Sequence, residues 1–309
     1  MLSPGATYSA PTLLAAWSDA GLDGLSDRLH RHVRARASHP RSARPLTLNT
    51  WEAIYFDHDL ARLTALADRA AEVGVERYVL DDGWFLGRRD DTSALGDWTV
   101  DPVVWLDGLH PLVDHVRGLG LQFGLWVEPE MISLGSEVAR AHPEWVVPGR
   151  SSRHQYVLDV ANPSAFAYLL ERLDALISEY ALDALKWDHN RDALLVGAHA
   201  QTVAVYRLLD ELRARHPGCE IESCASGGGR TDLGTLAHSD RIWANNCTDA
   251  VEPVHPALDG PAAAAGAGRR PRLRSRRAHH APGGRAVAAA GHGSVRARRH
   301  RVGHHQLHA

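Results

Sequence analysis

The sequence is poor in several features, and each scarcity excludes a class of protein. It has 309 residues but only three cysteines, too few to suggest a disulfide framework. No apolar run reaches the ~18 residues of a membrane span, and the N-terminus lacks the basic and apolar regions of a signal peptide. We therefore expect a cytoplasmic protein with no membrane partner, long enough for one large α/β domain or two small ones.

Lysine is rarer still, because Lys186 is the only one and arginine supplies every other basic side chain except histidine. It lies in Leu182-Asp-Ala-Leu-Lys-Trp-Asp-His-Asn-Arg191, where apolar residues precede polar ones. In an extended segment the side chains of Lys186, Asp188 and Asn190 point the same way. An ammonium beside a carboxylate keeps it ionised, as a nucleophile requires. This segment alone fits a surface ion pair at a strand end equally well.

Acidic and aromatic residues are missing from residues 260–309, which contain eleven arginines and seven histidines. Without these arginines the formal charge of -3 becomes -14 for residues 1–259. A basic tail on an acidic body is a pattern that can bind nucleic acid or an anionic surface. We expect no nucleic-acid partner, because a different explanation of the tail, given below, accounts for its composition.

Strand and helix patterns alternate through the middle of the chain. A helix over 22–37 and a proline-bounded linker form a lead-in, residues 1–44, and the alternation occupies residues 45–252. We predict strands at 45–51, 77–82, 121–128, 155–160, around Lys186, at 220–224 and at 241–245. We predict helices at 58–73, 110–119, 136–142, 163–180 and 198–216. Such alternation indicates a parallel sheet. The first strand–helix turn lacks Gly-x-Gly-x-x-Gly, which counts against a dinucleotide fold.

Polar or aromatic residues end every predicted strand. They are Trp51, Asp81 and Asp82, Trp126 and Glu128, Asp159, Asp188, Cys224, and Trp243 and Asn245. In a (β/α)8 TIM-type barrel all these ends meet on one face, whereas an open sheet uses only its switch point. We therefore predict an α/β fold of the barrel type. Carboxylates and tryptophans suit a sugar site. No strand end supplies a histidine pair, so we expect no metal, and His189 should point away from the site.

Five motifs, in order, resemble glycoside hydrolase family 36, which consists mainly of α-galactosidases with related plant transferases of the raffinose group. They are Asn49-Thr-Trp-Glu52, Asp81-Asp-Gly-Trp-Phe85, Leu125-Trp-Val-Glu-Pro-Glu-Met131, Lys186-Trp-Asp-His-Asn-Arg191 and Glu222-Ser-Cys-Ala-Ser-Gly-Gly-Gly-Arg230. The resemblance covers residues 45–250. It implies a catalytic barrel that hydrolyses terminal α-galactosides such as melibiose and raffinose by a retaining double displacement, without a cofactor.

The resemblance also implies a role for each matching residue. Asp188 resembles the nucleophile that forms a covalent galactosyl intermediate. Asp81 and Asp82 resemble the pair that binds the far hydroxyls of galactose. Lys186 resembles the residue that holds a ring hydroxyl and keeps the nucleophile ionised. The pocket walls, hydroxyl-binding groups and lining residues implied in the same way are Trp51, Trp126, Arg153, Asn190, Cys224 and Gly227.

One departure from the family concerns the acid/base. In Trp243-Ala-Asn-Asn-Cys-Thr-Asp249, Asn245 and Asn246 stand where the family has Ser and the acid/base Asp. Asparagine cannot transfer a proton, and general acid–base help is worth ~10²- to 10⁴-fold in rate. We expect weak turnover of natural galactosides, while aryl galactosides still react with Asp188. Asp249 could substitute only if it reached the glycosidic oxygen.

A second departure is the tail, residues 253–309, because the resemblance stops after Glu252. Pro253-Val-His-Pro-Ala-Leu-Asp259 can be encoded so that reading one base later gives Arg-Ser-Ile-Gln-Arg-Trp, as the family has here. The stretches 258–272 and 293–304 behave in the same way. Our hypothesis is a frameshifted translation of a GC-rich gene, and the alternative is a genuine basic arm. We thus expect a barrel truncated at both ends, incomplete at its C-terminal end, and no family-type oligomers.

Two other functions stay open at this point. Asn246 and the tail are compatible with a catalytically dead remnant that only binds galactose. The same barrel is also compatible with a raffinose-type galactosyl transferase.

Overall fold

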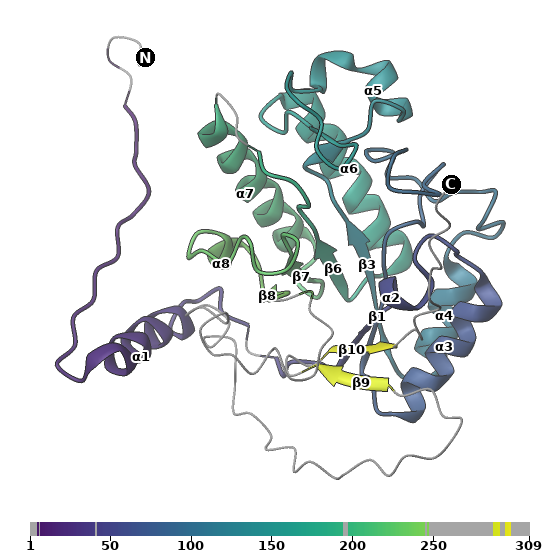
Figure 1. The fold of residues 1–309 in the computed structure, drawn as a ribbon, viewed down its shortest axis with the longest axis horizontal. Coiled ribbons are helices and arrows are strands. Elements are labelled where there is room, and N and C mark those ends of the chain that lie inside the picture. Colours follow the sequence, from purple (N-terminus) through teal and green to yellow (C-terminus); the bar gives the residue numbers. More distant parts are fainter. Residues whose placement is uncertain are drawn as a thin grey trace, which may run out of the picture.

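An extended N-terminal segment leads into the first helix, α1 (Gly21–Arg34), which lies apart from the rest of the fold (Figure 1). The computed structural model describes residues 5, 7–40, 42–193, 197–244 and 246, together with the backbone of 287–290 and 294–297. Helix α1 buries only Val33, and Arg36 just beyond it donates to the Leu233 carbonyl at 2.9 Å. The predicted lead-in helix is therefore present and ends three residues earlier than expected.

Six parallel strands form the main sheet, which is an incomplete TIM-type barrel. In spatial order they are β1 (Thr47–Asn49), β2 (Arg77–Leu80), β3 (Gln122–Val127), β6 (Ala184–Trp187), β7 (Glu220–Ser223) and β8 (Arg241–Ile242). The registers place Leu48 beside Tyr78 and Leu125 beside Leu185. Because all six strands run the same way, their C-terminal ends share one edge. The predicted barrel-type sheet is confirmed.

Two further strands adjoin β1. Strand β10 (Ser294–Ala297) pairs with it in parallel, and β9 (Val287–Ala290) pairs antiparallel to β10 (Figure 1). The sequence predicted no element after residue 245, because this stretch is dominated by alanine, glycine, arginine and histidine. The remainder of 253–309 lies outside the described residues.

Helices cover the sheet, and local signals explain where they begin and end. The long connections are α3 (Leu60–Glu72), α4 (His110–Gly118), α6 (Pro163–Tyr180) and α7 (Ala198–Arg215). Asp59 accepts a bond from the Arg62 amide at the start of α3, and Asn162 accepts one from the Ser164 amide at the start of α6. Leucines and other apolar residues at helical spacing then bury one face of α6 against the sheet. In the described part of the chain, none of the helices is long and apolar enough to cross a membrane.

Two strand predictions were wrong in detail. Instead of a barrel strand, residues 155–160 contain β5 (Tyr156–Val157), which pairs antiparallel with β4 (Met131–Ile132) in a separate two-stranded sheet. Asp159 is therefore not at the edge of the main sheet. Short apolar runs look alike in both settings, so periodicity could not separate them. Trp51 begins helix α2 (Trp51–Ile54) rather than ending a strand.

Short elements complete the fold. They are α5 (Glu137–Ala141), the 3₁₀ helix η1 (Pro143–Trp145) and α8 (Thr235–His238). With β5 removed from the barrel, the strand predicted at 241–245 becomes the sixth of the main sheet rather than the seventh strand of a barrel. It is observed at 241–242, and Asn245 lies outside the described residues.

Candidate active site

Buried polar side chains gather at the C-terminal edge of the main sheet. They follow β1, β2, β3 and β6, or lie on them, and each is buried: Asn49, Asp81, Asp82, Glu128, Lys186 and Asp188. Burying so many ionisable groups is costly unless each finds a partner. The contacts below show how this cost is offset.

Lys186 on β6 faces Asp81 after β2. Its Nζ lies 3.2 Å from Asp81 Oδ2, and Asn49 Nδ2 donates to the same oxygen at 2.5 Å. Burial alone would lower the pKa of Lys186, but Asp81 and the other acids nearby raise it above its usual value. The lysine is therefore a permanent cation here. It pairs directly with Asp81 rather than with Asp188, which the sequence had suggested as its neighbour.

Asp188 accepts several hydrogen bonds at the end of β6. Its Oδ2 accepts from Trp126 Nε1 at 3.1 Å and from Asn190 Nδ2 at 2.6 Å, while Oδ1 accepts from the His189 amide at 2.9 Å. Burial raises the pKa of Asp188, but the Lys186 charge and the donors, including the Cys224 thiol, bring it below its usual value. The structure thus holds Asp188 as a buried, ionised carboxylate.

Asp82 has a partner that sequence analysis missed. Arg88, only 1% exposed, donates from Nε and Nη2 to the two oxygens of Asp82 at 3.0 and 2.8 Å. Burial raises the pKa of Asp82 to about 6, although Arg88 opposes the shift. Arg88 and Arg89 are adjacent in the sequence, and Arg89 pairs instead with Asp101. Nothing in the sequence indicated which of the two arginines turns inward.

Two carboxyl groups after β3 also belong to the cluster. Burial and the neighbouring Asp188 raise the pKa of Glu128 to about 8. Burial also acts to raise the pKa of Glu130, but Arg230 and His189 bring it well below its usual value. The sequence had marked Glu128 only as a strand end, and it assigned no role to Glu130 or Arg230. Glu130 and Arg230 both lie within the quoted motifs, but they are 100 positions apart.

Trp243 connects Asn246 to Lys186, because it contacts both side chains. The Lys186 ammonium is 4.5 Å from the centre of the Trp243 ring, and Trp243 Nε1 donates to Asn246 Oδ1 at 2.7 Å. The Asn246 side chain belongs to an exposed residue, so it reaches solvent beside the buried cluster. Asp249, the alternative acid considered from the sequence, lies outside the described residues.

The other predicted residues differ in how closely they approach Asp188. Cys224 is buried against it, and burial raises the pKa of its thiol well above the usual value, so the thiol keeps its proton. Gly227 is buried nearby with φ +95°, a conformation that favours glycine.

Arg153 is exposed, with Nη1 3.4 Å from the Asn190 carbonyl. Trp51 is partly exposed and packs edge-on against Tyr55 and Phe56.

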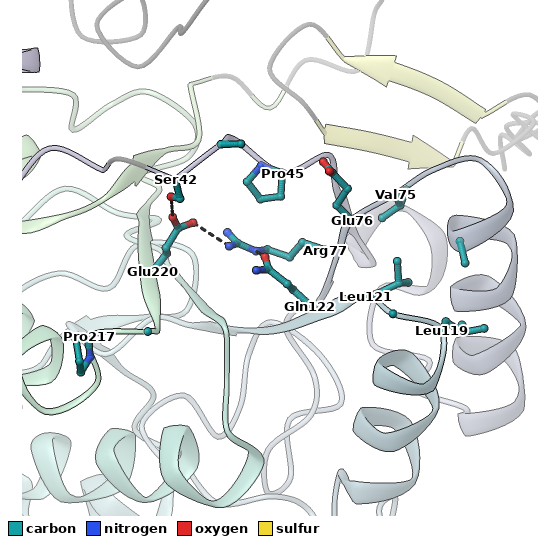
Figure 2. A pocket seen from close by; sticks show the side chains of 14 residues that line it. Ser42, Pro45, Val75, Glu76, Arg77, Leu119, Leu121, Gln122, Pro217 and Glu220 are labelled. Atoms are coloured by element: carbon teal, nitrogen blue, oxygen red, sulfur yellow. Dashed lines mark hydrogen bonds and ion pairs between the residues drawn. The ribbon is translucent and has the colours of Figure 1, made fainter.

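A cavity of about 700 Å³ lies at the opposite, N-terminal edge of the sheet, away from this cluster (Figure 2). Figure 2 shows Arg77 directed between Gln122 and Glu220. In barrels this face usually contributes to stability, while the other carries the chemistry. Within the described residues, no group of three or more His, Cys, Asp or Glu side chains could hold a metal ion. The candidate site is therefore the buried cluster around Asp188.

The family model described as Melibiase matches residues 7–258. An alpha-galactosidase of Escherichia coli is 46% identical over 259 residues, covering 80% of this chain and 37% of the relative. GH36 alpha-galactosidase AgaA of Geobacillus stearothermophilus superposes with a TM-score of 0.71 at 40% identity, covering 76% of this chain and 35% of that one.

A second crystal structure of AgaA, a variant in complex with raffinose, has the same TM-score of 0.71 and identity of 40%, and covers 76% of this chain and 36% of that one. The chain spans little more than a third of the length of the curated relatives that it matches.

Proposed function

The chain belongs to the melibiase family, and from that membership we propose that it is a retaining α-galactosidase acting on terminal α-D-galactosides of the melibiose and raffinose type. The observation that carries the proposal is Asp188, a buried carboxylate kept ionised at the end of β6 by Lys186 and by donors from Trp126, Asn190 and Cys224. The raffinose bound to AgaA supports the class of substrate. The resemblance found in the sequence to glycoside hydrolase family 36 is thereby confirmed.

In the proposed reaction, an Asp188 oxygen attacks the anomeric carbon of galactose. The bond from that carbon to the leaving oxygen breaks, and a galactosyl ester of Asp188 forms. Water then attacks the same carbon and releases the Asp188 carboxylate. Lys186, Asp81 and Asp82 would bind the sugar hydroxyls, as the resemblance to the family implies, and their ion pairs hold them beside the nucleophile. Trp51 and Trp126 would form walls, with Arg153, Asn190, Cys224 and Gly227 completing the pocket.

The weak point of this reaction is proton transfer. With asparagine at position 246, the leaving oxygen departs without a proton, and the attacking water has no base. The side chain that Trp243 holds can donate a hydrogen bond but cannot supply a proton. We therefore propose that p-nitrophenyl α-galactoside, whose leaving group is stable as an anion, is turned over faster than melibiose.

The test is hydrolysis of p-nitrophenyl α-galactoside by the purified chain beside Asp188→Ala. We expect activity that falls by at least ~10³-fold in the variant, as is usual when a catalytic nucleophile is removed. Asp174→Ala is a matched control, because that carboxylate pairs with Arg215 and His216 on the outer surface. Equal activity of Asp188→Ala and the native chain would contradict the assignment of the nucleophile.

A catalytically dead, galactose-binding remnant is the second candidate, and Asn246 is the observation that favours it. In that case galactose binds saturably to folded protein, while no aryl galactoside is cleaved. A raffinose-type transferase would instead reveal itself through oligosaccharide products when sucrose is the acceptor.

The domain boundaries are likewise proposals: a lead-in at 1–44, a catalytic unit at 45–252 and a frameshifted tail at 253–309. Resequencing the gene and mapping peptides from the tail test the last of these, since peptides in the given frame would contradict the frameshift. The cytoplasmic location expected from the sequence is tested by fractionating the producing cells.

A further inference from the structure

The segment Glu128-Pro129-Glu130 follows β3 and carries two carboxyl groups that are almost completely buried, 0% and 4% exposed. The proposed reaction uses neither of them. Buried carboxyl groups without a role in chemistry are expensive unless their contacts serve another purpose. Most of their partners lie on the elements that carry or flank Asp188, and the remaining one is Gln155, just before β5.

Glu130 joins two neighbouring parts of the site. Its Oε1 accepts from Trp187 Nε1 at 2.9 Å, and Trp187 is the last residue of β6. The same oxygen accepts from Arg230 Nη1 at 2.8 Å, in the glycine-rich segment after β7. His189 Nδ1 lies 3.4 Å from the other oxygen. One carboxylate thus fastens both residues that flank Asp188 and the loop that contains Cys224 and Gly227.

Glu128 holds the backbone of Asn190 in place. Its Oε1 accepts from the backbone amide of Asn190 at 2.5 Å, and its Oε2 accepts from Gln155 Nε2 at 3.0 Å. The side chain of Asn190 donates in turn to Asp188 at 2.6 Å. Asn190 therefore connects Glu128 to the carboxylate of Asp188 through two consecutive hydrogen bonds.

We propose that Glu128 and Glu130 are positioning residues, which hold Asp188 and the 224–230 loop in the geometry needed for attack on the sugar. Contacts from Glu128 and Glu130 fix residues 187, 189 and 190. The carboxylate of Asp188, which lies between these residues, therefore has little freedom to rotate away from the sugar. The inference rests on the proposed function in that Asp188 is taken as the nucleophile. Misplacing a reacting group by ~1 Å can cost ~10²-fold in rate, which sets the expected size of the effect.

The variant Glu130→Gln tests the proposal with little change in size. An amide oxygen can still accept from Trp187, but the charge that pairs with Arg230 is lost. We expect kcat for p-nitrophenyl α-galactoside to fall by roughly 10- to 100-fold per folded molecule, with KM changed far less. Glu130→Asp should not restore kcat, because the shorter side chain cannot reach both partners. Folded protein is quantified by near-UV circular dichroism.

Glu220→Gln is the matched control, because Glu220 pairs with Arg77 and Arg241 at the opposite edge of the sheet. It removes the same charge from a similar ion pair, so it should lower stability while leaving kcat per folded molecule unchanged. If Glu220→Gln lowers kcat as much as Glu130→Gln does, the effect is one of general stability and the proposal is wrong.

Amide hydrogen exchange gives a readout that does not depend on turnover. In Glu130→Gln we expect residues 187–190 and 225–230 to exchange faster together, and in Glu128→Gln only residues 188–190. Unchanged exchange in both segments would overturn the proposal. If the native chain cleaves no aryl galactoside, the proposed function has failed, and the exchange experiment still decides whether the two carboxyl groups hold these loops.

Discussion

The two edges of the main sheet use buried charge in opposite ways. At the N-terminal edge, Glu220 is held by Arg77 and Arg241, with Ser42 as a further donor. At the C-terminal edge, carboxyl groups outnumber cations by five to three: Asp81, Asp82, Glu128, Glu130 and Asp188 against Lys186, Arg88 and Arg230. At the N-terminal edge one carboxylate is shared by two cations, whereas the C-terminal edge has more carboxyl groups than cations.

The pKa values express this difference. At the N-terminal edge, donors and nearby arginines overcome burial and lower the pKa of Glu220 to about 2. At the C-terminal edge, burial raises the pKa of Asp82 to about 6 and that of Glu128 to about 8. An excess of buried carboxyl groups over cations reduces stability, but carboxylate oxygens are the acceptors that a sugar with many hydroxyl donors requires. Under the proposed function, one edge serves stability and the other binds the sugar and carries the chemistry.

Adding one more carboxyl group to the C-terminal edge should have the largest effect. In Asn246→Asp the side chain can both give and take a proton, so we expect hydrolysis of melibiose to rise by ~10²- to 10⁴-fold. The gain with p-nitrophenyl α-galactoside should be smaller, since its leaving group needs no proton. The ratio of kcat/KM for the two substrates measures this. An unchanged ratio would mean that position 246 does not face the leaving group.

Breaking the N-terminal edge should instead affect stability. Glu220→Ala leaves Arg77 and Arg241 close together without their shared carboxylate, and removing one member of a buried pair costs about 3 kcal/mol. Urea unfolding measures the loss. Activity per folded molecule should be unaffected, and a fall in kcat at full folding would show that the two edges are coupled.

The smallest expected effect concerns pH. The pKa of Glu128 is about 8 in the folded chain and 4.5 in its unperturbed state, so the native state binds the proton more tightly. Stability contributed by Glu128 is therefore lost as pH rises between about 4.5 and 8. Glu128→Gln has no proton to lose, so its free energy of unfolding relative to the native chain should be higher at about pH 8.5 than at about pH 5.

Glu220 provides the opposite case for that measurement. Its pKa is lowered from 4.5 to about 2, so its contribution to stability is lost as pH falls through that range. A Glu128→Gln chain whose relative stability is independent of pH between about 5 and 8.5 would contradict the raised pKa of Glu128.

Much of the fold could be predicted from the sequence, because the signals were local. Alternating strands and helices indicated the parallel sheet, and the alternation of Lys186, Asp188 and Asn190 indicated a shared face. The structure brings these three side chains into one cluster. Periodicity could not show that residues 156–157 pair with Met131 and Ile132 outside the main sheet, since both settings need the same short apolar run.

The missed residues depend on contacts between distant or ambiguous positions. Arg230 meets Glu130 only because β7 and β3, the strands that precede them, both pair with β6 in the sheet, so its role follows from topology. Arg88 differs from Arg89 only in the direction of its side chain, which the turn after β2 determines. Residue type alone could suggest a sugar site at the strand ends but could not say which carboxyl group each arginine neutralises.

The scarcity of lysine has a consequence for chemical labelling. The single lysine side chain is 8% exposed, and Asp81 keeps it protonated, whereas amine-directed reagents attack only the neutral, accessible form. In the folded protein such a reagent should react with the α-amino group and spare Lys186. The fraction of chains modified at Lys186 would then measure how often the proposed sugar site opens.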